Sequence, residues 1–207
     1  MRIGIYGGSF DPVHVGHLLA AETAREQARL DRVIFVPAAA SPHKPGVTLA
    51  PAADRLAMLT LATAGHDAFS VSPIELDRGG PSYTIDTLGE LAQAHPRDTL
   101  VLILGPDALA SFATWREPAR IAAVAELLPV ERETLDDLAA LASAGGLASL
   151  LGPEATAALV ARRVRMPAIG IRATGLRAAV AAGRSIRYQT PRAVERFIQT
   201  HGLYGSR

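Results

Sequence analysis

Residues 7–17 have the sequence Gly-Gly-Ser-Phe-Asp-Pro-Val-His-Val-Gly-His and directly follow a short apolar run that begins at Ile3. Glycines let an anion approach the backbone, a helix start offers unpaired N–H groups, and imidazoles add donors for negative charge. His14 and His17 are three positions apart, so on a helix they share one face about a turn apart. The segment therefore predicts a strand, a glycine turn and a helix whose first turn presents two imidazoles to a phosphate.

Two other phosphate motifs are excluded in this segment. It has no Gly-Lys-Ser/Thr, which a P-loop requires, and its glycines do not follow the dinucleotide-binding fingerprint. The alternative without chemistry is a turn whose two histidines only cap or pack.

Two further segments carry residues that suit anions. Lys44, the single lysine of the chain, stands in a Ser-Pro-His-Lys-Pro stretch, where prolines stiffen the loop around a cation; an ordinary solvated lysine is the alternative. Residues 79–88 have the sequence Gly-Gly-Pro-Ser-Tyr-Thr-Ile-Asp-Thr-Leu, a turn before a helix that begins near Thr84. The N–H groups at that helix start favour a small carboxylate, and plain capping is the alternative.

Two more segments suit a nucleoside and a second phosphate. Gly105 and Asp107 follow a predicted strand, where a carboxylate suits the two hydroxyls of a ribose. Trp115, the only tryptophan, could stack on a flat ring or simply fill the core. Residues 171–177, Ile-Arg-Ala-Thr-Gly-Leu-Arg, put a helix start beside Arg177, which suits phosphate, whereas a surface arginine is the alternative.

Composition limits the classes of partner. The chain has 207 residues, 49% of them hydrophobic, and a formal net charge of +1, so neither a nucleic-acid polymer nor an anionic membrane is expected to bind. The absence of cysteine excludes disulfides, cysteine nucleophiles and thiolate zinc sites. No apolar run approaches the roughly 20 residues that span a bilayer, and no signal-peptide pattern precedes Ile3. We therefore expect a cytoplasmic protein.

The elements that must position these residues alternate along the chain. Apolar β-branched runs predict strands at 2–6, 32–37, 68–73, 99–104, 125–130 and 164–169. Helices are predicted at 15–29, 52–64, 84–94, 117–123, 134–143, 153–162, 175–182 and 191–200, with Thr174 and Thr190 as the N-caps of the last two. This alternation predicts an α/β fold with a doubly wound, Rossmann-like parallel sheet, in one domain of residues 1–207 whose C-terminal part, about 171–207, is helical.

The first segment resembles the His-x-Gly-His signature of nucleotidyltransferases, which class I aminoacyl-tRNA synthetases share. The longer string from Gly7 to His14 is similar to that of bacterial nicotinate-nucleotide adenylyltransferases. The resemblance extends over residues 2–204 and also includes Pro-His-Lys at 42–44, Ser-Tyr-Thr at 82–84 and Asp-Ala-Leu at 107–109.

The resemblance implies roles for individual residues. It implies catalytic roles for His14, His17, Lys44 and Arg177. It implies that ATP is bound by Gly7, Gly8, Ser9, Phe10, Gly16, Gly105, Asp107, Thr174 and Leu176. It implies that the acceptor is bound by Tyr83, Thr84, Trp115 and Arg116.

The reaction that the resemblance implies joins ATP and nicotinate mononucleotide into nicotinate adenine dinucleotide and pyrophosphate, with Mg²⁺ carried by ATP and no metal site of protein side chains. Pantetheine-phosphate adenylyltransferase, which shares the histidine motif and the fold, is an alternative, although Trp115 and the Ser-Tyr-Thr element argue against it. A nucleotide-binding module impaired in catalysis is another alternative, because Arg172 and Ala173 stand where the family has two serines. A homo-oligomer also stays open.

Overall fold

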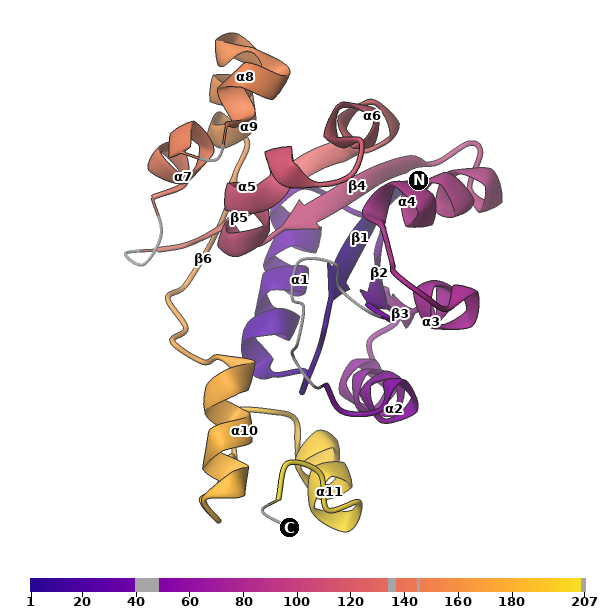
Figure 1. The fold of residues 1–207 in the computed structure, drawn as a ribbon, viewed down its shortest axis with the longest axis vertical. Helices are drawn as coiled ribbons and strands as arrows, with labels where there is room; N and C mark the ends of the chain where they lie inside the picture. Colours follow the sequence, from indigo (N-terminus) through magenta and orange to yellow (C-terminus); the bar gives the residue numbers. More distant parts are fainter. Residues whose placement is uncertain (40–48, 134–136, 145, 206–207) are drawn as a thin grey trace.

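Six parallel strands form one sheet in the described part of this computed structural model, which covers residues 1–39, 49–133, 137–144 and 146–205. The order across the sheet is β3-β2-β1-β4-β5-β6, which is one of the orders of a doubly wound sheet, the topology that was predicted (Figure 1). Ile5 in the middle of β1 lies opposite Ile34 on one side and Leu102 on the other. The strands are β1 (Arg2–Gly8), β2 (Arg32–Pro37), β3 (Phe69–Val71), β4 (Thr99–Leu104), β5 (Glu126–Arg132) and β6 (Val164–Met166).

Helices occupy the connections between the strands and the C-terminal part. They are α1 (Val15–Gln27), α2 (Ala52–Thr63), α3 (Ile74–Arg78), α4 (Thr84–Ala94), α5 (Pro106–Ser111), the 3₁₀ turn η1 (Phe112–Thr114), α6 (Pro118–Val124), α7 (Leu138–Ala144), α8 (Leu147–Leu151), α9 (Pro153–Ala161), α10 (Ala173–Ala181) and α11 (Arg192–Thr200).

The predicted elements are present, with some differences in extent. The edge strands β3 and β6 have three residues each, shorter than predicted, because each pairs with a single neighbour. The short helices α3, α5 and α8 were not predicted, since fewer than two turns leave little periodic signal. The helix predicted over 134–143 begins at Leu138, and residues 134–136 lie outside the described residues.

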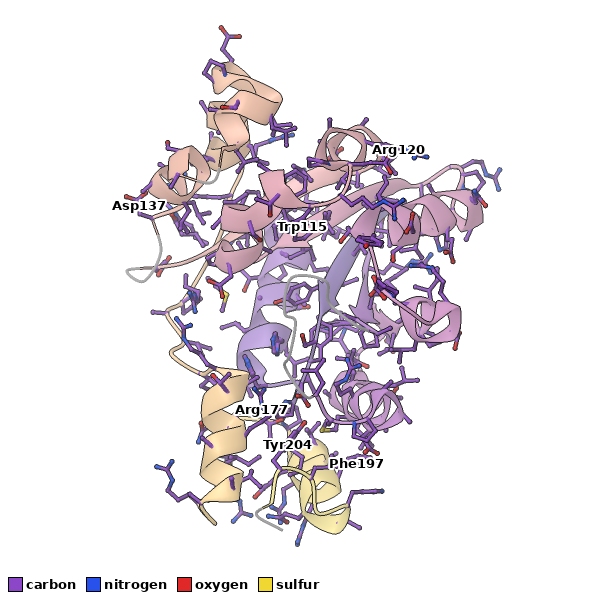
Figure 2. The ribbon with its side chains drawn as sticks, in the orientation of Figure 1. Trp115, Arg120, Asp137, Arg177, Phe197 and Tyr204 are labelled. Atoms are coloured by element: carbon purple, nitrogen blue, oxygen red, sulfur yellow. The ribbon has the colours of Figure 1, made fainter. Side chains whose placement is uncertain are left out.

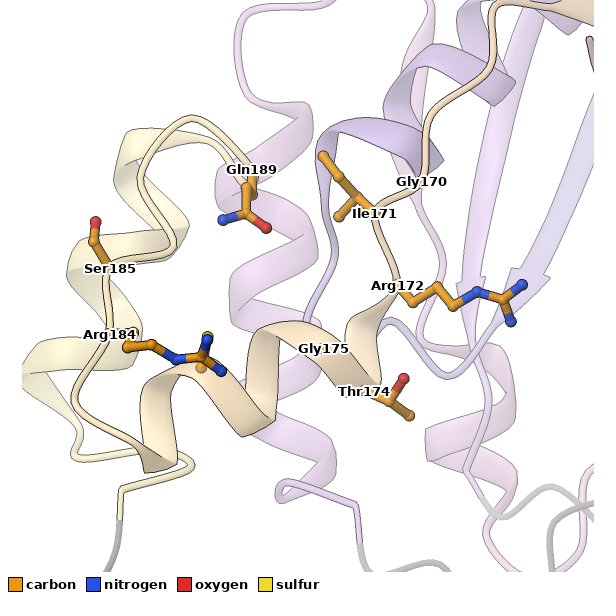
Figure 3. A pocket seen from close by; sticks show the side chains of 9 residues that line it. Gly170, Ile171, Arg172, Thr174, Gly175, Arg184, Ser185 and Gln189 are labelled. Atoms are coloured by element: carbon orange, nitrogen blue, oxygen red, sulfur yellow. The ribbon is translucent and has the colours of Figure 1, made fainter. Parts of the chain in front are cut away.

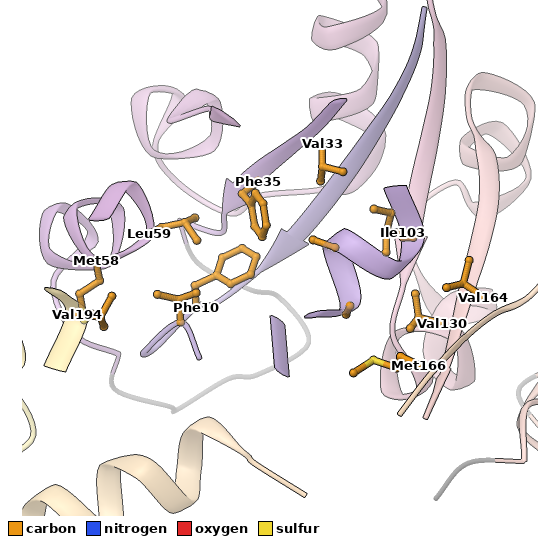
Figure 4. Close-up of a cluster of buried hydrophobic side chains, with 14 of the residues drawn as sticks. Phe10, Val33, Phe35, Met58, Leu59, Ile103, Val130, Val164, Met166 and Val194 are labelled. Atoms are coloured by element: carbon orange, nitrogen blue, oxygen red, sulfur yellow. The ribbon is translucent and has the colours of Figure 1, made fainter. Parts of the chain in front are cut away.

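The two faces of the sheet bury separate apolar clusters. Side chains alternate along β4, so that Val101 and Ile103 enter one cluster and Leu100 and Leu102 the other. The first cluster lies under α1, α2, α10 and α11 and includes Phe10 (Figure 4). The other lies under α4 to α9. Burial on both faces explains why the central strands are nearly continuous apolar runs.

The parallel arrangement brings the predicted site segments to one edge of the sheet. Residues 9–17 follow β1, residues 79–84 follow β3, residues 105–116 follow β4, and residues 171–177 follow β6. Because β1 has β2 on one side and β4 on the other, the crevice at the carboxyl ends of β1 and β4 is the switch point where such folds bind ligands.

None of the helices in the described ranges combines the length and apolar character that crossing a membrane would need.

Gly4 in β1 has no free space for a side chain. A Cβ atom at this position would lie 2.8 Å from Leu30 Cδ1 and 3.1 Å from Ile103 Cδ1. We expect Gly4→Ala to lower the free energy of unfolding by about 1–3 kcal/mol through overpacking, measured by urea denaturation.

Gly89 supplies the matched control for this prediction. It lies inside α4, and a Cβ atom added there would have no neighbour within 4 Å, so Gly89→Ala is expected to raise stability by up to about 1 kcal/mol through helix propensity. Equal changes in the free energy of unfolding for the two substitutions would contradict the close packing at Gly4.

Candidate active site

The loop between β1 and α1 is buried instead of solvated. Phe10 and Asp11 are almost fully buried, and Phe10 has a positive φ of 46°. The Phe10 ring packs against the rings of Tyr6, His17 and Phe35, with centroids 5.7, 5.1 and 5.8 Å away. The prediction of a glycine turn is wrong, because Gly7 and Gly8 are still paired with β2 and the turn is made by the residues after Gly8. An aromatic cluster packs beneath this turn and supports the first turn of α1.

A buried arginine from α2 holds the same loop from the side. The guanidinium of Arg55 donates to the carbonyls of Ser9 at 2.9 Å, Ala50 at 3.1 Å and Ala39 at 3.4 Å. Burial lowers its pKa from the usual arginine value. Arg55 is not among the predicted site residues, although its Arg-x-x-Met spacing belongs to the resemblance to the family. The signal for its burial is its position three and four residues before Met58 and Leu59, on the apolar face of the helix.

The two histidines of the motif come together as predicted. His14 is the N-cap of α1 and His17 its third residue, and their rings stack with centroids 3.7 Å apart. The His14 backbone N–H donates to His17 Nδ1 at 3.2 Å. Since Nδ1 accepts this hydrogen bond, the ring of His17 carries its proton on Nε2, where it is a donor for an anion.

Gly16 makes room for the stacked pair. A Cβ atom at this position would lie 3.0 Å from Nδ1 of His14, so a side chain here would push the ring aside. The glycine between the two histidines is therefore a steric requirement of their stacking.

Burial determines the charge of His14. The residue is 7% exposed, and burial lowers its pKa to about 4, so the ring is neutral at pH 7. Within the described ranges its Nδ1 is buried without a hydrogen-bond partner. The start of α1 thus presents neutral imidazole donors beside the positive end of a helix dipole.

Arg177 of α10 reaches the histidine loop. Its Nη1 donates to the Asp11 backbone carbonyl at 2.7 Å and lies 3.8 Å from Asp11 Oδ2. Leu176, by contrast, is 1% exposed and belongs to the core, so only its backbone could contact ATP. The same holds for Phe10.

A pocket of about 440 Å³ opens at the start of α10 (Figure 3). Arg172, Thr174 and Arg184 are among its lining residues, together with Gly170, Ile171, Gly175, Ala179, Ser185 and Gln189. The prediction that Thr174 caps this helix is wrong, because Arg172 is the N-cap and α10 begins at Ala173. The hydroxyl of Thr174 is therefore available to a ligand in the pocket. Two arginines and a helix start give this pocket a preference for anions.

The predicted acceptor residues form a second group. Tyr83 is the N-cap of α4, Thr84 is its first residue, and the guanidinium of Arg116 lies 4.7 Å from the centroid of the Tyr83 ring. Trp115, next to Arg116, donates from Nε1 to Ser111 Oγ at 3.2 Å and is partly exposed.

The remaining predicted residues fall in three places. Gly7 and Gly8 end β1, and Ser9 has its carbonyl bonded to Arg55. Gly105 is the N-cap of α5, and Asp107 is exposed in the first turn of that helix. Lys44 lies outside the described residues.

Known proteins resemble this chain along its length. Residues 5–179 match the family model described as cytidylyltransferase-like. A Thermus thermophilus protein described as "Probable nicotinate-nucleotide adenylyltransferase" is 46% identical over 204 residues, which cover 99% of this chain and 100% of that protein. A Roseiflexus sp. protein with the same description is 47% identical over 205 residues, which cover 98% of this chain and 97% of that protein.

The fold also has a solved counterpart. The structure of Plasmodium falciparum nicotinic acid mononucleotide adenylyltransferase complexed with NaAD matches with a TM-score of 0.74 at 17% identity and covers 98% of this chain and 97% of that one. At such low identity the likeness shows the fold alone. The two bacterial relatives are far more similar in sequence and align over nearly their whole length. This chain therefore belongs to the family of nicotinate-nucleotide adenylyltransferases.

Proposed function

We propose that this chain transfers the adenylyl group of ATP to nicotinate mononucleotide and releases pyrophosphate. The observation that carries this function is the stacked pair of His14 and His17 at the start of α1, on the ligand-binding edge of the sheet. The descriptions of the bacterial relatives supply the substrates.

The reaction needs no nucleophile from the protein. An oxygen of the acceptor phosphate attacks the α-phosphorus of ATP in line, the new P–O bond joins the two nucleotides, and the bond to the β-phosphate oxygen breaks. Because the attacking oxygen is already ionised, catalysis reduces to positioning two anions and offsetting the charge that develops between them.

The residues of the histidine loop and α10 suit the phosphates of ATP. Nε2–H of His17 is the donor that the tautomer inferred from the hydrogen bond at Nδ1 supplies, and His14 beside it adds a second imidazole. Arg177 and Lys44 offset negative charge, and the pocket with Thr174 receives the phosphate tail. The glycines before and between the histidines leave the backbone accessible, and Gly105 and Asp107 lie at the end of β4, where a ribose would bind.

The group around Tyr83 suits the nicotinate end of the acceptor. Trp115 offers a flat partly exposed ring for stacking, while Arg116 and the start of α4 at Thr84 favour a carboxylate. The nicotinate carboxylate is therefore the group that this end of the site would recognise.

Mg²⁺ is proposed to arrive with ATP. Within the described ranges no group of three or more histidine or acidic side chains could hold a metal ion. The buried carboxylate nearest the histidine loop, that of Asp11, is engaged by Tyr204 and the Ala50 backbone. When bound, the ion would neutralise phosphate charge as part of the nucleotide.

The proposed function is tested by supplying the purified protein with ATP, Mg²⁺ and one acceptor at a time. Pyrophosphate release is expected with nicotinate mononucleotide. Release with 4′-phosphopantetheine instead would move the chain to the related adenylyltransferases, and ATP binding without release would make it a nucleotide-binding module.

His17→Ala removes the donor that the tautomer assignment places toward the phosphates. We expect turnover to fall about 10²- to 10³-fold, as the loss of one preorganised donor does elsewhere, measured as the rate of pyrophosphate release. His201→Ala, at the exposed end of α11, is the matched control and should retain full activity. A folded His17→Ala protein with normal turnover would remove His17 from the mechanism.

Acceptor choice tests the group around Tyr83. We expect kcat/KM for nicotinate mononucleotide to exceed that for nicotinamide mononucleotide roughly 10- to 100-fold, because a charge-assisted hydrogen bond and a helix start reward the carboxylate. Arg116→Gln should narrow this ratio. Equal kcat/KM values for the two acceptors in the unaltered protein would show that the carboxylate is not recognised.

The buried His14 predicts a pH-dependent stability. In the unfolded chain His14 takes up a proton near its ordinary pKa of 6.5, but in the folded protein only near 4. The unfolded state therefore binds more protons between these values, and stability falls as the pH drops from about 6.5 to about 4, by up to about 3 kcal/mol.

His14→Asn isolates this contribution, because it removes the titrating ring and leaves the other ionisable groups in place. Urea denaturation at pH 7 and pH 4.5 should show that the stability advantage of the unaltered protein over His14→Asn shrinks at the lower pH. An advantage that stays constant would contradict the burial of a neutral ring.

A further inference from the structure

The C-terminal segment ends on the histidine loop. Tyr204 Oη donates to Asp11 Oδ1 at 2.5 Å, and the Ala50 N–H reaches the same oxygen at 3.3 Å. Asp11 is 1% exposed, so this carboxylate is withdrawn from water. Figure 2 shows Tyr204 and Arg177 close to each other below α1.

The second carboxylate oxygen of Asp11 forms only a long ion pair with Arg177 and no hydrogen bond to it. Oδ2 is buried and has no hydrogen-bond partner within the described ranges, and it lies 3.8 Å from Nη1 of Arg177. A charge-assisted N–H···O⁻ bond would be about 2.7–2.9 Å long. Nη1 instead donates to the backbone carbonyl of Asp11 at 2.7 Å, and the side chain of Arg177 is 25% exposed.

The carboxylate and the nucleotide would compete for the same guanidinium. An unsatisfied buried charge is costly. When a buried carboxylate loses a hydrogen-bond donor, it therefore forms a closer ion pair with the nearest cation. Arg177 is that cation, and an arginine closed into a two-point pair with a carboxylate has fewer N–H groups left for phosphate.

We propose that Tyr204 is a positioning residue: its hydroxyl satisfies Asp11 and thereby keeps Arg177 available to the phosphates of ATP. This inference rests on the proposed function, in which Arg177 is a phosphate ligand. It adds a residue close to the C-terminal end of the described chain to the set that determines nucleotide affinity.

Tyr204 is held where this role requires it. Burial and the neighbouring Asp11 raise its pKa far above the ordinary tyrosine value, so the hydroxyl keeps its proton and remains a donor. Before α11, Thr190 Oγ1 donates to the Val13 carbonyl at 2.8 Å, and the Val15 N–H donates to the Gln189 carbonyl at 3.0 Å. The segment that carries Tyr204 is thus tied to residues 11–15 at both of its ends.

Tyr204→Phe removes the hydroxyl and little else. We expect the Kd and the KM for ATP to rise about tenfold, while the KM for nicotinate mononucleotide stays within about twofold. ATP binding is measured by calorimetry without acceptor, kinetics by pyrophosphate release, and folding by thermal denaturation. Tyr188→Phe, at an 85% exposed tyrosine, is the matched control and should bind ATP as the unaltered protein does.

A double variant separates positioning from simple structural damage. Asp11→Asn keeps the oxygen that accepts from Tyr204 but removes the charge that attracts Arg177. Adding Tyr204→Phe to Asp11→Asn should therefore change ATP affinity less than about threefold, whereas a structural role predicts that the two losses add.

The outcomes are distinct. Unaltered ATP affinity in Tyr204→Phe, an equal loss for both substrates, or additive losses in the double variant would each overturn the inference. If Asp11→Asn does not fold, the comparison of ATP and acceptor effects in Tyr204→Phe decides alone. If the unaltered protein binds ATP but forms no dinucleotide, the proposed function fails, while the calorimetric comparison still tests the role of Tyr204.

Discussion

Two buried side chains of opposite charge hold the loop after β1, and the rest of the site depends on them. Arg55 donates to three backbone carbonyls, and Asp11 accepts from Tyr204 and from the Ala50 backbone. Burying either charge alone would be costly, and these hydrogen bonds offset the loss of water. The loop on which the stacked histidines rest is fixed by polar contacts from α2 and the C-terminal segment, and by the aromatic packing of Phe10 beneath it.

The neutral hydrogen-bond donors and the positively charged groups of this site lie on different elements. The histidines are stacked 3.7 Å apart, a distance at which two imidazolium charges would repel each other strongly. Permanent positive charge comes instead from Arg177 on α10, after β6, and from Arg116, after β4 and η1. Such a division suits a reaction between two anions, because the central groups donate hydrogen bonds while the outer groups attract and orient the substrates.

The sequence predicted those parts of the structure that are encoded locally. Apolar runs identified the strands, their parallel order placed the site segments at one edge, and the spacing of His14 and His17 predicted a shared helix face. Contacts between distant residues left no such pattern. Thr190 has the residue type of an N-cap, but its hydroxyl binds the Val13 carbonyl and Pro191 occupies the cap position. Arg55 resembles any helical arginine until its partners, which come from the connections after β1 and after β2, are known.

The tie between the two ends of the chain has a consequence for folding. Tyr204 and Asp11 are separated by 193 positions, and Thr190 and Val13 by 177, so these contacts close some of the longest loops in the molecule. Closing a long loop is entropically unfavourable, and such contacts form late when shorter ones can form first. The sheet and its helices can therefore become ordered before the contacts between the histidine loop and the C-terminal segment form.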